Sequence, residues 1–515
     1  MKLRSTLRSS AIRCLAVGVT AALVATGCSS GRSDSKGSAS GGTLVVGYTA
    51  DPNTLDPWKA TQFQAVHLLE QVYGTLTQLD GDLNVVPGLA EKWQYGDDNK
   101  TLTLTLRKDV KFADGKPLTS ADVKSSIERI QKPATAAVAA ATVKSVKTVQ
   151  APDPQTVVFT LTAPDAGLLA GLATVNLAVL AKDDTSEAIA QKPNGTGPFT
   201  FASRTAGQSV KLTANANYWG GKPKVANLEF RIIPDQTSVV SGLQSGNVQF
   251  ATLDDPLVAK SAEGSGLTVT KTPSLSYHVL QLNSRKAPLD KLDVRLAISC
   301  AIDRKQVLDT AALGEGEVTG PITSPAYKSD PNARPCPTRD VNKAKQLLAG
   351  AGFANGLTIP TIVSQGEYAT SVNEAQNLQA QLKEAGINLE IKTLESGAYV
   401  DRWVAADFTA AVALNGGRPD PDGMYGRYFT STGNLNKVAG YSSPELDELF
   451  ADGKATTDPA KRKEIYAQVG KLLEDNAAWV WLFASYGYTV TAQGVQGFTP
   501  MANGSLQNLK DVSLN

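Results

Sequence analysis

Few side chains in this sequence are spaced for catalysis. His67 and His278 are its only histidines, so neither a His-Glu-x-x-His zinc motif nor a cluster of imidazole ligands can form. The Gly-x-Ser-x-Gly turn of serine hydrolases is absent as well. A Ser-x-x-Lys match at 33–36 lies in a Gly- and Ser-rich stretch that cannot preorganise a nucleophile. We therefore expect no catalytic residue, metal or cofactor, with a secreted lipoprotein hydrolase as the remote alternative.

The four cysteines indicate an oxidising compartment. Cys14 and Cys28 lie near the N-terminus, which leaves Cys300 and Cys336 as one possible pair. A disulfide between them would stabilise the fold by about 4 kcal/mol on the chain-entropy argument. Two separately buried thiols are the alternative. No Cys-x-x-Cys spacing suggests structural zinc.

The N-terminus is typical of an exported bacterial lipoprotein. Four basic residues precede an apolar run over 15–24 that is too short to cross a bilayer stably. The residues Ala25-Thr26-Gly27-Cys28 resemble a lipobox, which implies lipidation of Cys28. An ordinary cleaved signal peptide is the alternative. We predict a signal peptide over 1–27 and a flexible tether over 28–42, because the tether is almost entirely Gly, Ser, Ala and scattered charge.

The composition is typical of a globular protein that is exposed to water. The 515 residues are 42% hydrophobic with a net charge of +1, which is ample for cores and argues against nucleic acid as a partner. No later run is long and apolar enough to cross a membrane. The length predicts about two to four domains.

Hydrophobic periodicity predicts an α/β protein with mixed sheets. Residues 101–106 alternate Thr and Leu as in a half-buried strand, and a helix should start at Thr119 with a capping box to Asp122. A helix over 58–73, a long helix over about 290–309, and two closing strands over 479–483 and 486–490 are also expected.

Several separated motifs resemble one family, the extracytoplasmic solute-binding proteins of peptide-type ABC importers (family 5, which includes dipeptide, oligopeptide and nickel binders). The likeness runs from about residue 43 to the C-terminus. The motifs are Gly88–Trp93, Leu102–Phe112, Asp114–Thr119, Gly195–Phe199, Asn217–Gly220, Asn283–Pro288 and Ala301–Arg304.

The resemblance implies a two-lobe periplasmic-binding-protein fold of type II, with an extra domain and a ligand cleft between the lobes. It also implies a substrate-binding protein that delivers a small solute or peptide to an ABC permease and ATPase complex, as a monomer held by lipid on the outer face of the cell membrane. A ligand sensor on the same fold is the alternative. The implied boundaries are 43–60 with 190–274 and 484–515 for the first lobe, 61–189 for the extra domain and 275–483 for the second lobe.

One loop departs from the family's peptide-binding pattern. Peptide binders of the family anchor the ligand amine with an Asp in a Gly-Trp-x-Ala-Asp-Tyr-Pro-Asp-Pro segment. The matching segment here is 414–421, where Gly417 stands in the Asp position and Arg418 adds a positive charge. Arg418 could bind an anionic ligand or pair with Asp420 or Asp422. The ligand class stays open among peptides, opines, sugars and metal chelates.

The other candidate ligand contacts come from the same resemblance and from side-chain type. Each has a structural alternative: an Asx-turn for Asp51, a satisfied core position for His278, and aromatic core packing for the tryptophans. The complete set is Asp51, Asn53, Tyr277, His278, Trp403, Asn415, Gly416, Gly417, Arg418 and Trp481.

Overall fold

The computed structural model describes residues 41–365, 368 and 370–515. The predicted signal peptide, the lipidation at Cys28 and most of the tether lie outside these residues. Over the described part of the chain, no helix combines the length and hydropathy that a membrane crossing requires.

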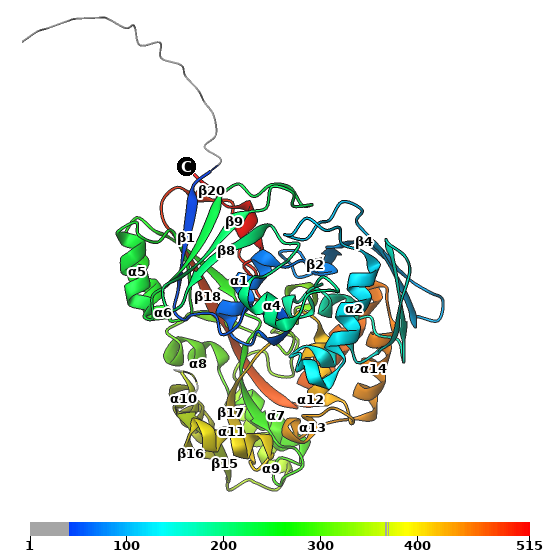
Figure 1. Ribbon diagram of the computed structural model, residues 1–515. Coiled ribbons are helices and arrows are strands. Elements are labelled where there is room, and N and C mark those ends of the chain that lie inside the picture. Colours follow the sequence, from blue (N-terminus) through cyan, green and yellow to red (C-terminus); the bar gives the residue numbers. More distant parts are fainter. Residues whose placement is uncertain (1–40, 366–367, 369) are drawn as a thin grey trace, which may run out of the picture. The chain divides into compact units, whose positions relative to one another are not determined.

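A twelve-stranded mixed sheet is the main structural element, and strand β18 (Trp479–Thr491) joins its two halves. The first residues of β18 pair with β13 (Tyr277–Leu282), and its last residues pair with β11 (Phe250–Leu253). Figure 1 shows β18 running from the half that holds β1 to the half that holds β17. The prediction of two separate closing strands was wrong, because β14 (Gly316–Val318) pairs across residues 483–485 and keeps the ladder continuous.

The first half of the sheet surrounds β1, which is parallel to both of its neighbours, β10 and β11. Helices α5 (Gln236–Gln244) and α6 (Pro256–Ala262) pack against β1 and β11 through small aliphatic side chains. Strand β9 runs antiparallel to β10 and to β8, and β12 runs antiparallel to β18. The bounds of the strands in this half are β1 (Thr43–Tyr48), β8 (Phe199–Thr205), β9 (Ser209–Ala214), β10 (Asn227–Ile232) and β12 (Thr268–Pro273).

The second half contains β13, β15 (Leu357–Gln365), β16 (Ile387–Glu395) and β17 (Ala410–Asn415). Strands β15, β16 and β17 are parallel, whereas β13 runs antiparallel to β17. Buried aliphatic side chains of this half pack against α10. The neighbouring helices are α7 (Leu292–Cys300), α8 (Arg304–Ala311), α9 (Val341–Gly350), α10 (Ser371–Glu384) and α11 (Ser396–Val404).

The predicted long helix over 290–309 is two helices, α7 and α8. Asp303 has an extended backbone and accepts a hydrogen bond from the Gln306 amide at 3.0 Å, so it begins α8 as an N-cap. The structure also joins Cys300, the last residue of α7, to Cys336 by a disulfide.

A separate four-stranded antiparallel sheet follows the order β4-β5-β7-β6 and is covered by α2 (Ser120–Ile130). In β5 (Thr101–Leu106) the leucines are buried and the threonines half-buried, as the alternation predicts. The Thr119–Asp122 capping box is present. These two local predictions are confirmed. The other strands are β4 (Ala90–Tyr95), β6 (Val146–Asp153) and β7 (Thr156–Leu161).

Helix α1 (Phe63–Val72) begins five positions later than predicted, because Pro57–Lys59 form a separate 3-10 turn capped by Asp56. The remaining strands are β2 (Thr77–Leu79), β3 (Val85–Pro87), β19 (Val495–Gln496) and β20 (Ser513–Leu514). The remaining helices are α3 (Leu168–Gly171), α4 (Ser186–Gln191), α12 (Arg427–Phe429), α13 (Asn436–Ala439), α14 (Pro444–Ala455) and α15 (Pro459–Asp475).

Candidate functional site

The loop that departs from the family pattern starts where β17 ends. Asn415 is the last residue of β17 and lies opposite Tyr277 of β13 in the antiparallel ladder. Its side-chain amide donates a hydrogen bond to the Tyr277 hydroxyl at 3.4 Å. Strand pairing therefore fixes the position from which residues 416–421 leave the sheet. The chain then enters a π-helical turn over Asp422–Gly426, a conformation frequent at functional sites.

Only glycine fits at position 417. A Cβ atom there would lie 1.9 Å from the backbone oxygen of Leu275. An aspartate at 417 would thus require the backbone at Leu275 to move. Gly416 has open space around it, since no atom lies within 4 Å of a Cβ built there. This loop conformation therefore excludes an amine-anchoring carboxylate at position 417.

Arg418 is exposed and extends across the start of the π-helical turn. A Cβ built on Gly423 would lie 3.5 Å from Arg418 Cδ. Across residues 41–365, 368 and 370–515, no hydrogen bond or ion pair involves the Arg418 side chain. Desolvation by the surrounding protein lowers the pKa of Arg418, and the like charge of Arg427 lowers it further. Arg418 thus carries an uncompensated positive charge at the loop.

The two carboxylates considered as partners of Arg418 are engaged elsewhere. Both oxygens of Asp420 bind the Arg462 guanidinium, with Arg462 Nη2 at 2.9 Å from Oδ1. Asp422 forms an ion pair with Lys454 at 3.4 Å. The alternative in which Arg418 pairs with Asp420 or Asp422 is therefore wrong for this structure.

A second arginine near the loop was not predicted from the sequence. Arg427, at the start of α12, lies 4.7 Å over the Tyr428 ring, and its Nε is buried without a hydrogen-bond partner. Burial raises the pKa of Tyr428, while the positive charges of Arg427 and Arg418 both act to lower it. Arg427 therefore lies against the Tyr428 ring, a contact that no spacing in the sequence predicts.

Two of the three aromatic candidates lie inside the protein. Trp481 is fully buried, and its indole nitrogen donates to the Tyr425 hydroxyl at 2.9 Å. Tyr277 is also buried, with its ring centroid 5.7 Å from that of Tyr425. Trp403, on α11, is half-buried and donates to the Gln281 side chain at 2.6 Å. Tyr277 and Trp481 thus belong to the core, whereas Trp403 stays partly exposed.

His278 belongs to a buried chain of polar groups. Its Nδ1 lies 2.8 Å from Glu374 Oε1, its Nε2 lies 2.7 Å from Ser485 Oγ, and its ring stacks on Phe483 at 4.1 Å. The order serine, histidine, carboxylate matches a hydrolytic triad. Here, however, the histidine is nearly inaccessible, and the Ser485 carbonyl accepts a hydrogen bond from the amide of Ser274. We interpret the chain as a link that holds β13, β18 and α10 together.

Asp51 and Asn53 lie in the loop after β1. The Asp51 carboxylate accepts from the Gly207 amide at 2.9 Å and pairs with Arg204 at 3.0 Å. Burial acts to raise the pKa of Asp51, but these hydrogen bonds and the Arg204 charge outweigh it and lower the pKa. Asn53 is exposed and donates to Thr61 at 3.2 Å. Asp51 therefore links the β1 loop to the β8–β9 hairpin, and no contact among the described residues joins Asp51 or Asn53 to Arg418.

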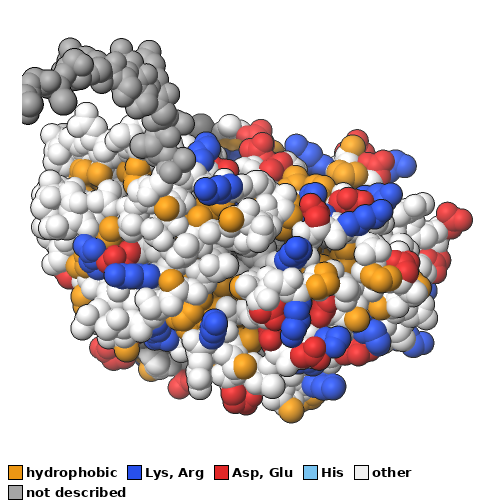
Figure 2. All heavy atoms as spheres, turned by 45° about the horizontal axis from the view of Figure 1, so that its top comes forward, with side chains coloured by type: hydrophobic (Ala, Val, Ile, Leu, Met, Phe, Trp, Pro, Cys, Tyr) orange, Lys and Arg blue, Asp and Glu red, His pale blue; other side chains and the backbone are white. Residues whose placement is uncertain are grey.

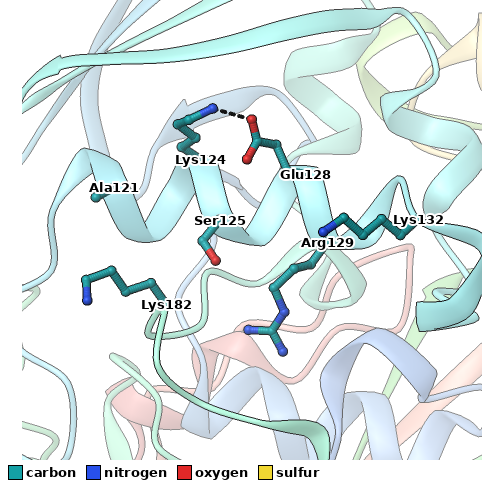
Figure 3. A pocket seen from close by; sticks show the side chains of 7 residues that line it. All are labelled: Ala121, Lys124, Ser125, Glu128, Arg129, Lys132 and Lys182. Carbon is teal, nitrogen blue, oxygen red and sulfur yellow. Dashed lines mark hydrogen bonds and ion pairs between the residues drawn. The ribbon is translucent and has the colours of Figure 1, made fainter.

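A shallow pocket of about 420 Å³ beside α2 has a basic lining (Figure 3). Its cations are largely compensated: Lys124 pairs with Glu128, Arg129 stacks over Trp58 at 4.7 Å, and Lys182 binds Asp183 at 2.9 Å. Figure 2 shows charges of both signs interspersed over one face of the molecule. Among the described residues, no group of three or more His, Cys, Asp or Glu side chains is arranged to hold a metal ion. The pocket is thus part of an ordinary solvated surface.

The fold and the family comparison define an extracellular solute-binding protein. The model of the bacterial extracellular solute-binding proteins, family 5, matches residues 84–437. The chain belongs to this family, which confirms the predicted α/β binding-protein fold. It is a substrate-binding protein of the peptide-type ABC importers, whose members work outside the cytoplasm as binding proteins and not as enzymes.

Two curated relatives and one solved structure illustrate the similarity. The probable D,D-dipeptide-binding periplasmic protein DdpA of Escherichia coli K12 is 33% identical over 482 residues, covering 88% of this chain and 91% of DdpA. The glutathione-binding protein GsiB of the same strain is 26% identical, covering 94% and 95%. HbpA2 from Haemophilus parasuis superposes with a TM-score of 0.84 at 26% identity, covering 92% of this chain and all of HbpA2.

Proposed function

We propose that this chain is the lipid-anchored receptor of an ABC importer, which captures a small peptide or peptide-like solute and delivers it to the permease. The observation that carries the proposal is the loop at the end of β17. It presents exposed Gly416 and the uncompensated Arg418 on a scaffold of the peptide-binding family. The predicted lobe boundaries would place this loop in the second lobe, facing the cleft.

The names of the relatives support small peptides as ligands. DdpA is described as binding D,D-dipeptides and GsiB as binding glutathione, and each matches nearly the full length of this chain. Because position 417 has no room for an anchoring carboxylate, the peptide amine would not be held there. We therefore propose a ligand that this loop holds through another group.

The binding test uses the mature chain purified without denaturation. Native mass spectrometry should show a small co-purified ligand, and titration calorimetry should show saturable binding of a D,D-dipeptide or of glutathione. Arg418→Gln should weaken binding, whereas Arg402→Gln removes the same charge from an arginine already paired with Asp407 at 3.0 Å and should have little effect. Absence of both cargo and binding would contradict the proposal.

The transport test uses membrane vesicles that contain the cognate permease and ATPase. Adding the receptor with its ligand should raise ATP hydrolysis and move labelled ligand across the membrane. Ligand binding without any stimulation would favour the sensor alternative, and turnover of the ligand would favour the hydrolase alternative.

The anchoring test uses metabolic labelling with a radioactive fatty acid. The wild-type protein should carry label, and Cys28→Ser should carry none and should be released from the membrane. An unlabelled wild-type protein in the medium would show ordinary signal-peptide cleavage instead.

A further inference from the structure

The described chain begins on a surface where three segments distant in sequence meet. The Gly42 carbonyl accepts hydrogen bonds from the amides of Ala226 and Asn227, at 3.0 and 3.3 Å. A Cβ built on Gly42 would lie 2.8 Å from Leu514 Cδ1, so β20 also borders this point (Figure 1). The tether predicted over 28–42 therefore joins the globular part of the protein at this surface.

Two lysines on this surface have no counter-ion. Lys222 and Lys224 are exposed, whereas Pro223 between them and Val225 after them are buried. Because the buried neighbours fix this segment, both ammonium groups extend into solvent. Across residues 41–365, 368 and 370–515, neither lysine forms an ion pair or a side-chain hydrogen bond. Both charges are therefore available to a partner outside the chain.

The acidic side chains nearby are already paired. The Lys224 amide donates to the Lys510 carbonyl at 3.4 Å. The Lys510 ammonium in turn donates to Asp511 at 2.7 Å. On β10, Arg231 pairs with Glu229 at 2.7 Å. The surface keeps a positive charge, since five basic and only two acidic side chains occur in the segments that form it, which are 41–48, 209–232 and 492–514.

The predicted anchor brings this surface close to a bilayer. Cys28 and Gly42 are 14 residues apart, which is at most about 48 Å of extended chain and about 20 Å on average for a Gly- and Ser-rich coil. A tether of this length holds the surface at a high effective concentration near the lipid. Attraction to charged headgroups acts within about 8 Å at physiological salt, so it favours the part of the protein nearest the anchor.

We propose that the surface carrying Lys222 and Lys224, beside the start of β1, docks on the anionic lipid headgroups of the membrane that holds the anchor. This inference rests on the lipid anchoring in the proposed function and adds the orientation of the anchored receptor. Each lysine near an anionic bilayer favours the docked state about fivefold, so the pair favours it about 30-fold. The loop after β17 belongs to the other half of the sheet, so docking leaves that loop uncovered (Figure 1).

The experiment attaches the unlipidated mature chain to vesicles through its own Cys28. The thiol is coupled to a maleimide-bearing lipid, in vesicles of phosphatidylcholine alone or of phosphatidylcholine mixed with phosphatidylglycerol. Cys300 and Cys336 do not react, because they form the disulfide. Acetylation of the lysines, followed by mass spectrometry, then measures the accessibility of each ammonium group.

Lys222 and Lys224 should be acetylated about 10- to 30-fold more slowly on the anionic vesicles than on the neutral ones at 0.15 M salt. The difference should disappear at about 1 M salt, where charges are screened within about 3 Å. Lys345 is exposed on α9, which lies far from the start of β1 (Figure 1). Its acetylation rate should be the same on both kinds of vesicle.

Substitutions assign docking to the two lysines. Neutron reflectometry on anionic supported bilayers should find the wild-type protein against the headgroups, and the double variant Lys222→Gln with Lys224→Gln should move away from them. Lys343→Gln with Lys345→Gln is the matched control, because it removes two exposed lysines at the same spacing from α9. The control should dock like the wild type, and circular dichroism should show both variants folded.

The outcomes separate this inference from the receptor function. Equal acetylation on neutral and anionic vesicles, docking that persists in about 1 M salt, or unchanged docking of the Lys222 and Lys224 variant would overturn the inference and leave the receptor function intact. Protection of the two lysines only when the permease is present would make the permease the occupant and also overturn it. A wild-type protein without fatty-acid label in cells would defeat the anchoring and this inference together.

Discussion

The Arg462–Asp420 pair beneath the loop offers the sharpest test of how the site is held. Arg462, on α15, binds both Asp420 oxygens and also donates to the Gly453 carbonyl at 2.9 Å and the Tyr327 hydroxyl at 2.8 Å. Both members are nearly inaccessible, with side-chain exposures of 6% and 11%. Burial acts to lower the pKa of Arg462, but the Asp420 charge and hydrogen bonds outweigh it and raise the pKa.

We expect Arg462→Met to lower the free energy of unfolding by about 3–5 kcal/mol, because it leaves the Asp420 carboxylate buried without its partner. The methionine retains much of the aliphatic volume, so most of the loss is electrostatic. The matched control Arg402→Met breaks the more exposed pair with Asp407, where the partner can be solvated, and should cost about 1 kcal/mol or less.

Urea unfolding at pH 7, followed by tryptophan fluorescence, measures both variants. Because a two-lobe protein can unfold in more than one transition, the first midpoint and its slope should be compared. Asp420→Asn with Arg462→Met completes a double-mutant cycle, whose coupling should reach about 2 kcal/mol. A loss no larger than that of Arg402→Met, or additive single effects, would refute the reasoning.

Three further outcomes follow from buried groups in the same fold. Burial raises the pKa of Asp422 to about 6, above the value of about 3.9 in the unfolded chain. The ionised carboxylate therefore destabilises the fold above pH 6, and this penalty disappears as the pH falls to 4. Asp422→Asn should therefore raise the free energy of unfolding by up to about 3 kcal/mol at pH 7.5 and by little at pH 4 in urea titrations, and an equal gain at both pH values would contradict this origin. Replacing Cys300 and Cys336 by serine opens a loop closed at a separation of 36 residues and should cost about 4 kcal/mol by the same assay, whereas an unchanged urea midpoint would count against the bridge. His278→Ala removes one of the hydrogen-bond partners of the buried Glu374 carboxylate, which keeps the Thr370 hydroxyl, and should cost about 1–3 kcal/mol; a thermal midpoint equal to that of the wild type would argue against the structural role.

Local features of the fold could be predicted from the sequence because their causes are local. The Thr-Leu alternation over 101–106 has the two-residue period of a strand, and the Thr119–Asp122 capping box requires only three residues of separation. The family motifs likewise sufficed to predict the fold class, since they preserve turns and core positions in order.

Element boundaries were less predictable where distant segments decide them. The apolar stripe continues through 290–309, but the cap at Asp303 divides it into two helices. The sequence predicts two strands within 479–491, whereas the structure has one. Its continuity depends on pairing with Gly316–Val318, more than 160 residues earlier in the chain.

The charges of the loop at 414–421 were also determined partly by the sequence and partly by the tertiary structure. The sequence by itself determined that Gly417 replaces a carboxylate and that Arg418 adds a charge beside it. Only the tertiary structure decided that Asp420 binds Arg462, 42 residues away, and Asp422 binds Lys454, so that neither carboxylate is the partner of Arg418. The physical reason is that residue type sets the charge, whereas packing between distant segments sets which opposite charge can reach it.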